Sequence, residues 1–260
     1  MAKKIQKETE SEALNNDFVN IILDYHKELF TKATGYFDEE DILRMSRSFL
    51  TGEDFTPQKP YELNAKEDFL VSLMYDYFEI HNSFISLKTS YILAKKIKAN
   101  NYLPKNELLS YYYENFLSEL YMFSERMKMF FNTIEKQLEK LHLNEVYKSV
   151  VILRQSFIDA FKTIKLIRNQ HTHQRRYDNS MFKQLSHLQL MQNFDVIKDI
   201  PILRSYTDLA YKKNKKFFIE NMKEILDEIA KGSNDYINRI TPIVFDIMLK
   251  KFKQLEIKTK

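Results

Sequence analysis

The stretch KNELLSYYYENFLSELYMFSERMKMFFNTIEKQLEKL, residues 105–141, carries the most regular apolar pattern of this chain. Its large apolar residues recur every three or four positions: Leu109, Tyr113, Phe116, Leu120, Phe123, Met127, Phe130, Ile134, Leu138 and Leu141. Steps of three and four keep side chains on one side of an α-helix, in a near-heptad seam that suits packing almost parallel to other helices. The stretch therefore predicts a long helix inside a helical bundle.

The composition of the whole chain supports the same architecture. Only 3 glycines and 5 prolines occur in 260 residues, whereas a sheet-rich fold needs many turns and the residues that form them. With 44% hydrophobic and 29% charged residues, the chain is expected to fold and not to be disordered. We therefore predict an all-α fold, a long-helix bundle with additional N-terminal helices.

Further helices follow from apolar spacing and from residues that start or end helices. Asp38 is a candidate N-cap for a helix over 38–50, and Asn64 for one over 65–99, with a Gly- and Pro-containing loop at 51–64 between them. Beyond residue 141, we expect one helix that begins at Asn144 and three more that cover 178–193, 211–231 and 233–255. A loop at 195–201 precedes the last two helices, and Gly232 separates them. The predicted domains are a helical extension, 1–63, and the bundle, 64–260.

The helix that begins at Asn144 changes character near its end. Its apolar stripe runs through Val146, Val150, Leu153, Phe157, Ala160 or Phe161, and Ile164. The next steps of four and three fall on Arg168 and His171, so that Arg168 stands where the pattern asks for an apolar residue. At about 100° per residue, Asn169 and His173 share one helix face, and Arg168 lies beside it.

Positive charge is concentrated around these residues. Between Ala160 and Tyr177 the chain has Lys162, Lys165, Arg168, Arg175 and Arg176 and neither Asp nor Glu, although its net charge is only +4. Such a local field attracts phosphate groups. We therefore take Lys165, His171, Arg175 and Arg176 as candidate nucleic-acid-binding residues.

The sequence Arg168-Asn169-x3-His173 resembles the signature of the HEPN superfamily, all-α domains with a four-helix core. Many of these domains are metal-independent endoribonucleases of anti-phage defence and toxin–antitoxin systems. The resemblance implies RNA as substrate, no cofactor or metal, a homodimer in which two motifs face one cleft, and an antitoxin or defence-system protein as a possible partner. It also implies that Arg168, Asn169 and His173 are catalytic.

The implied chemistry suits these residue types. In this reaction the 2′-hydroxyl of RNA attacks the adjacent phosphorus. Imidazole titrates near pH ~6.5, so His173 can act as general acid or base. Arg168 would hold the phosphate and stabilise the phosphorane, and Asn169 would orient His173 or a phosphate oxygen.

Several alternatives stay open. His171 competes with His173 for the catalytic role, and basic residues also stabilise ordinary helix C-termini. A metal site at His171 and His173 is disfavoured because residues two apart point to different sides of a helix. The chain could instead be a non-catalytic helical module that binds nucleic acid or a partner protein. It could also be the partner of a nucleotidyltransferase, although the tyrosine expected two residues after the histidine is Arg175 here and the nearest tyrosine is Tyr177.

Other features carry weaker expectations. In the run SYYYENF, residues 110–116, we expect Tyr113 to be a core residue and not a base-stacking platform. The run YKKNKK, residues 211–216, is a solvated helix start or an extension of a nucleic-acid track, and either Glu119 or Glu125 could approach the motif. The chain has no cysteine, a polar start and no apolar run of about 20 residues, so we expect a cytoplasmic protein without membrane contact.

Overall fold

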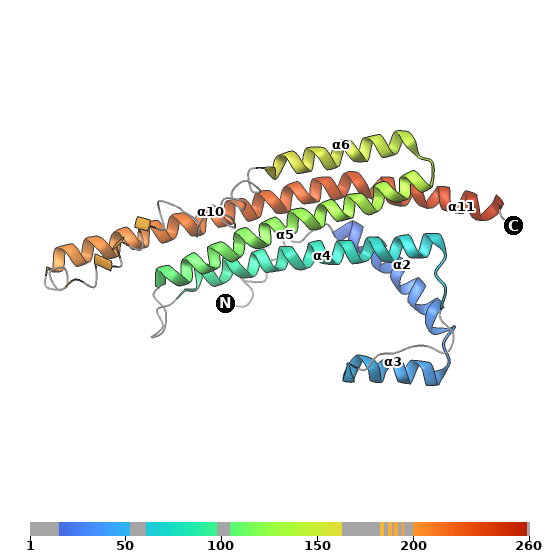
Figure 1. The fold of residues 1–260 in the computed structure, drawn as a ribbon, viewed down its shortest axis with the longest axis horizontal. Coiled ribbons are helices and arrows are strands. Elements are labelled where there is room, and N and C mark those ends of the chain that lie inside the picture. Colours follow the sequence, from blue (N-terminus) through green and yellow to red (C-terminus); the bar gives the residue numbers. More distant parts are fainter. Residues whose placement is uncertain are drawn as a thin grey trace. The chain divides into compact units, whose positions relative to one another are not determined.

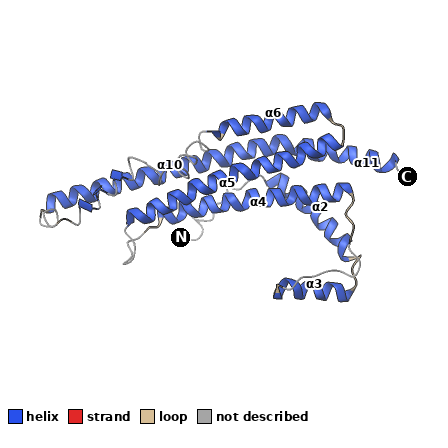
Figure 2. Ribbon diagram, in the orientation of Figure 1, coloured by secondary structure: helices blue, strands red, loops and turns tan. Residues whose placement is uncertain are grey.

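The computed structural model describes residues 16–52, 61–97, 105–162 and 200–258, together with single positions between 183 and 194. Within these residues every regular element is helical and there is no strand (Figure 2). The all-α prediction is therefore confirmed. The elements are α2 (Asn16–Thr34), α3 (Glu39–Thr51), α4 (Ala65–Lys95), α5 (Lys105–Lys140), α6 (Asn144–Ala160), α10 (Pro201–Pro242), η1 (Ile243–Met248) and α11 (Leu249–Lys258).

The predicted seam of residues 105–141 is the buried face of α5 and the residue that follows it. All ten of its apolar residues are buried, from Leu109 to Leu141. In Figure 1, α4 and α5 lie side by side along their length, as the near-heptad spacing predicts. The helix prediction for 105–141 is thus confirmed to within one residue.

Two of the predicted helix starts are confirmed by their caps. The Asp38 side chain accepts a 2.8 Å hydrogen bond from the Asp41 amide at the start of α3. Asn64 Oδ1 accepts bonds from the amides of Lys66 and Glu67, at 3.1 and 3.0 Å, at the start of α4. At its other end α3 is closed by Gly52, whose φ of 73° is the left-handed conformation that glycine adopts without a Cβ clash.

The predicted helices of residues 211–231 and 233–255 are wrong in two respects. The first predicted helix corresponds to α10, which begins at Pro201, ten residues earlier than expected. A proline at this position loses no hydrogen bond, because the first amide of a helix has no partner inside the helix. Helix α10 then continues through Gly232 without a break, since the buried residues Ile229, Ser233 and Ile237 keep one face packed on both sides of the glycine.

Pro242 marks the end of regular α-helix. Proline has no amide hydrogen, so it interrupts the helical hydrogen-bond ladder. The next six residues, Ile243–Met248, form a π-helical turn in which the amide of Leu249 donates to the carbonyl of Val244. The chain then returns to α-helix as α11.

The packing divides into two compact units, each made of segments distant in sequence. One contains the described residues of Phe78–Met129 and Ile152–Asp235. Its core includes aromatic pairs between Phe84 and Phe123, with ring centroids 6.4 Å apart, and between Tyr113 and Phe218, 5.2 Å apart.

The other unit contains the described residues of Asn15–Tyr77, Phe130–Val151 and Tyr236–Lys260. Its centre is Phe18 of α2, which is fully buried and has ring centroids 5.2 to 5.6 Å from those of Tyr77, Phe130 and Phe245. The predicted division into 1–63 and 64–260 follows chain order, whereas α2 packs into the same core as the first part of α4. The reason is the apolar surface of α2: Phe18 is fully buried, and its ring packs on Tyr77 of α4 and Phe130 of α5.

Candidate functional site

The predicted catalytic residues Arg168, Asn169 and His173 lie outside the described residues, as do the predicted nucleic-acid-binding residues. The latter are Lys165, His171, Arg175 and Arg176. The structure does describe α6, which ends at Ala160, and the two residues that follow it, Phe161 and Lys162.

The apolar stripe of α6 is packed up to that point. Val150 and Phe157 are fully buried, and Phe161, directly after the helix, stacks on Phe157 with ring centroids 4.5 Å apart. Phe161 also lies 6.2 Å from Phe123 of α5, whereas Ala160 is exposed. Phe161 therefore takes the stripe position that the sequence left open between residues 160 and 161. The next steps of this spacing in the sequence are Ile164 and Arg168, which lie outside the described residues.

The two glutamates considered as partners of the motif have different surroundings. Glu125 accepts a 2.6 Å hydrogen bond from Lys128 on its own helix, and both side chains are partly buried. Glu119 is also partly buried. Which of them approaches the motif stays open, because the motif is outside the described residues.

The aromatic run, residues 110–116, and the basic run, residues 211–216, both lie within the described residues. Tyr113 is buried and packs edge-on against Phe218, which confirms the core prediction, while Tyr111 is exposed. In the basic run, Lys212, Lys213 and Lys216 are exposed. These three ammonium groups lie on the surface of α10, whereas Lys215 donates a 3.3 Å hydrogen bond to the carbonyl of Ile97.

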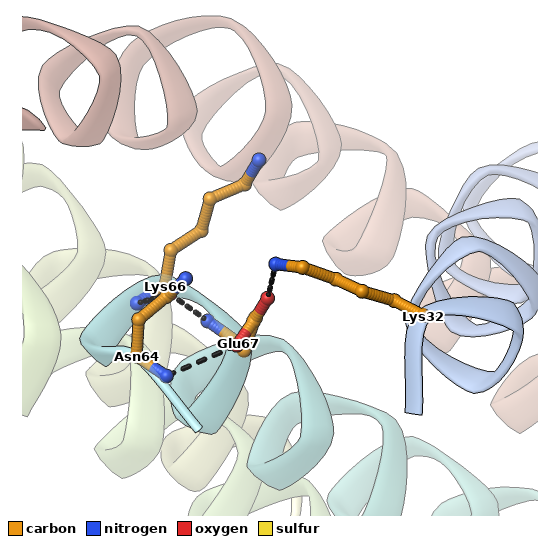
Figure 3. A network of polar contacts seen from close by, with 4 residues as sticks. All are labelled: Lys32, Asn64, Lys66 and Glu67. Carbon is orange, nitrogen blue, oxygen red and sulfur yellow. Dashed lines mark hydrogen bonds and ion pairs between the residues drawn. The ribbon is translucent and has the colours of Figure 1, made fainter. Parts of the chain in front are cut away.

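The described residues also contain a polar network between α2 and α4 (Figure 3). The Glu67 carboxylate accepts a 3.0 Å bond from the amide of Asn64 and a 2.6 Å bond from Lys32 Nζ. Since Asn64 caps the amide of Glu67 in return, the pair forms a reciprocal capping box. Sequence reasoning identified Asn64 as a cap but missed Lys32, which lies 35 positions from Glu67.

This network shifts the pKa values of both charged groups. Burial by itself raises the pKa of Glu67, but the hydrogen bonds from Lys32 and Asn64 and the charge of Lys32 outweigh it and hold that pKa below its ordinary value. The hydrogen bond to Glu67 and its negative charge raise the pKa of Lys32. Both residues therefore stay charged over the whole neutral range.

A cavity of about 220 Å³ lies beside the network. Its lining combines apolar side chains, among them Leu29, Leu70 and Met74, with the charged residues Lys32 and Glu67. Ligand sites for small molecules are usually larger, about 300–1,000 Å³, with a few convergent polar groups. Here Lys32 and Glu67 bind each other, so this pair holds α2 against α4.

Lys66, at the edge of the cavity, has an aromatic partner. Its Nζ lies 5.4 Å from the ring centroid of Tyr25, and the same ring also stacks on Phe245 with an interplanar angle of 3°. Figure 3 shows the Lys66 side chain extending away from the bond between Lys32 and Glu67. The cation–π contact thus ties the start of α4 to α2 without using the carboxylate.

Metal binding and membrane insertion can be examined for the described part of the chain. There, no three His, Asp or Glu side chains lie close enough to hold one metal ion. None of the helices described is both long and apolar enough to cross a bilayer.

No family model, curated protein or solved structure matches this chain.

Proposed function

We propose that this protein is a metal-independent endoribonuclease of the HEPN type, with Arg168, Asn169 and His173 as its catalytic residues. The observation that supports the proposal is the packed stripe of α6, together with the place of the motif in the sequence after this helix. The apolar stripe of α6 is packed through Phe157 and Phe161, and Arg168 replaces the apolar residue two steps later in the same stripe. A cation at such a position needs a polar partner, and RNA phosphate supplies one.

The reaction balances with these residues alone. The 2′-oxygen of a ribose forms a bond to the adjacent phosphorus as its proton passes to a base, and the bond from phosphorus to the 5′-oxygen breaks as that oxygen receives a proton. The products are a 2′,3′-cyclic phosphate and a 5′-hydroxyl. His173 transfers protons, Arg168 stabilises the added negative charge of the phosphorane, and Asn169 orients the imidazole or a phosphate oxygen.

The basic surroundings serve substrate binding. Lys165, Arg175 and Arg176 provide cations beside the motif, and His171 adds an imidazole, in a stretch without a carboxylate. Such charges bind phosphates irrespective of base sequence and make binding weaker as salt rises. We place the activity in a cytoplasmic defence or toxin–antitoxin system, with two copies of the chain forming one cleft and an antitoxin or defence protein as partner.

The test is RNA cleavage by the purified protein in the presence of EDTA. Wild-type protein should cut, and His173→Ala and Arg168→Ala should each lose at least about 100-fold in rate, the usual contribution of a general acid–base or an oxyanion-type group. His171→Ala, which removes the competing imidazole two residues away, should lose less activity than His173→Ala, because it should affect RNA binding and not proton transfer. Circular dichroism must show the same helix content in all four proteins.

Two results would contradict the proposal. One is equal cleavage by wild type, His173→Ala and Arg168→Ala, which would assign the activity to a contaminant or to other residues. The other is activity that depends on His171 and not on His173, which would move the general acid–base to the competing histidine.

A second candidate is a non-catalytic helical module that binds nucleic acid. It is favoured by the exposed ammonium groups of Lys212, Lys213 and Lys216 on α10, which provide a binding surface without a catalytic group. This candidate predicts RNA binding that weakens steeply with salt and produces no cleavage products. Gel-shift measurements at two salt concentrations, with product analysis on the same samples, separate the two functions.

A further inference from the structure

The first part of α10 has a buried side and, opposite it, an exposed side with large apolar residues. One side is buried and includes Thr207, Phe218 and Met222. The other side is defined by Ile202, Tyr206, Leu209, Lys213 and Phe217, which we call the α10 stripe. At about 100° per residue these five positions fall within about 80° of one another around the helix. A surface helix normally presents polar residues opposite its buried face, so this arrangement needs an explanation.

The large apolar members of the α10 stripe are well exposed. Ile202 is 77% exposed, Tyr206 67%, Leu209 66% and Phe217 52%. Scattered apolar residues on a surface are normal, but four on one face of one helix form a contiguous patch. Such a patch marks an interaction surface.

The same helix provides an internal comparison. Eighteen residues are five full turns, so each position of the stripe recurs on the same face 18 residues later. There, Ile202, Tyr206 and Leu209 are replaced by Glu220, Glu224 and Asp227, and Lys213 by Lys231. All four later residues are exposed. This face is therefore charged in one part of α10 and apolar in the other.

We propose that the α10 stripe binds the α10 stripe of a second copy of this chain, with the two helices antiparallel. In this arrangement each residue of one copy faces a residue of the second copy, and the two residue numbers of such a pair sum to about 419. The stripe is then complementary to itself. Ile202 then faces Phe217 of the second copy, and Leu209 lies next to the twofold axis. Lys213 faces Tyr206, so that the one charged group of the stripe meets an aromatic ring.

The position of Lys213 favours a second copy over an unrelated apolar partner. A lysine within an apolar patch opposes burial against a purely apolar surface, because its ammonium group would lose water without gaining a partner. A tyrosine ring facing it converts that cost into a cation–π contact, worth roughly 0.5–2 kcal/mol. The four exposed apolar side chains also offer on the order of 600 Å² per copy, most of the roughly 800 Å² that each partner buries in a standard interface.

This inference deepens the proposed function, which requires two copies of the chain, but it is carried by α10 and not by the motif. The two can fail separately. A dimer without ribonuclease activity would leave the interface standing, and a monomeric ribonuclease would overturn the interface alone.

Cysteine cross-linking tests the register directly, because the chain has no cysteine of its own. Under mild oxidation, Leu209→Cys should give a disulfide-linked dimer, since residues beside the twofold axis face their own copies. Asp227→Cys is the matched control on the same face. In the proposed register its two copies lie roughly 50 Å apart along the helices, at 1.5 Å per residue, so it should remain monomeric in a denaturing gel. Equal cross-linking of both variants, or of neither, would overturn the register.

Sedimentation velocity with substitutions of equal charge change tests the surface itself. Lys213→Glu places an anion against the face of Tyr206 and should weaken dimerisation at least about tenfold, whereas Lys231→Glu, on the same face five turns later, should leave it unchanged. A monomeric wild type at micromolar concentration, or equal effects of both substitutions, would overturn the proposal. So would a Lys213→Glu variant that loses only RNA binding, because the stripe would then belong to a nucleic-acid track.

Discussion

Arg126 of α5 binds two residues of α4, and its replacement by methionine gives a sharp test of the packing. The guanidinium binds the Glu79 carboxylate at 3.1 Å, the Glu79 carbonyl at 3.3 Å and the hydroxyl of Ser83. Ser83 is fully buried, whereas the Glu79 side chain is 54% exposed. Methionine keeps the apolar stem of arginine and removes only the polar contacts.

The expected cost follows from these exposures. The ion pair with Glu79 is largely solvated and contributes about 0.5 kcal/mol. The buried hydroxyl of Ser83 loses a charged hydrogen-bond donor, which costs about 1–3 kcal/mol. The lower half of that range applies, because the hydroxyl can instead donate to the carbonyl of Glu79 in its own helix. Arg126→Met should therefore lower the free energy of unfolding by about 2 kcal/mol.

Urea denaturation followed by circular dichroism measures this loss. Lys136→Met, which removes an exposed cation from the same helix, should change the free energy of unfolding by less than about 0.5 kcal/mol. In a double-mutant cycle, Ser83→Ala should make part of the Arg126→Met loss disappear, because the orphaned hydroxyl is gone. Strict additivity, or a loss no larger than that of Lys136→Met, would refute the reasoning.

Three further predictions concern the free energy of unfolding. Gly232→Ala should raise it by about 0.5–1 kcal/mol in a thermal or urea melt, since the glycine lies within α10 and an added Cβ meets no atom within 4 Å; a loss would contradict this. Glu67→Gln should cost about 0.5–1 kcal/mol at pH 7, and the control Glu62→Gln almost nothing. Because the pKa of Glu67 is lowered in the folded protein, its contribution is fully present above the ordinary carboxyl pKa of about 4.3 and is lost as pH falls through the folded value. A difference between wild type and Glu67→Gln that stays constant as pH falls below about 4.3 would therefore refute the assignment. Tyr211→Phe should leave the free energy of unfolding unchanged or raise it by up to about 1 kcal/mol. The reason is that the buried hydroxyl has no hydrogen-bond partner among the described residues, and its burial raises the pKa of Tyr211 to about 12. A loss of more than about 1 kcal/mol would contradict this reasoning.

The fold was predictable where the information is local. An apolar stripe such as that from Leu109 to Leu141 indicates which side of a helix is buried, independently of what packs against it. All members of this stripe are buried in the structure. Asp38 and Asn64 were predictable as caps for the same reason, since each bonds amides within three residues of itself.

The wrong predictions at Pro201 and Gly232 arise from tertiary packing. A single glycine weakens a helix by only about 1 kcal/mol, and burial of the neighbouring Ile229 and Ile237 exceeds that cost. The start of α10 was missed because its exposed apolar residues, Ile202 and Leu209, do not show the alternation of apolar and polar faces that identifies a surface helix.

The site was less predictable than the fold. The bond between Lys32 and Glu67 joins residues 35 positions apart, and no local sequence pattern predicts such a pair. The catalytic assignment to Arg168, Asn169 and His173 is a short motif outside the described residues and stays a prediction, supported by the packed helix that precedes it.

The most direct test of the central claim is the position of cleavage in an RNA oligonucleotide that has a single 2′-deoxyribose, measured in EDTA. If the 2′-hydroxyl is the nucleophile, the bond that follows the deoxyribose should resist cleavage, and the other products should end in 2′,3′-cyclic phosphate. His173→Ala should leave every bond of the normal oligonucleotide intact. Cleavage at the deoxyribose at the rate of the unmodified position, or products with a 5′-phosphate, would contradict the proposed reaction.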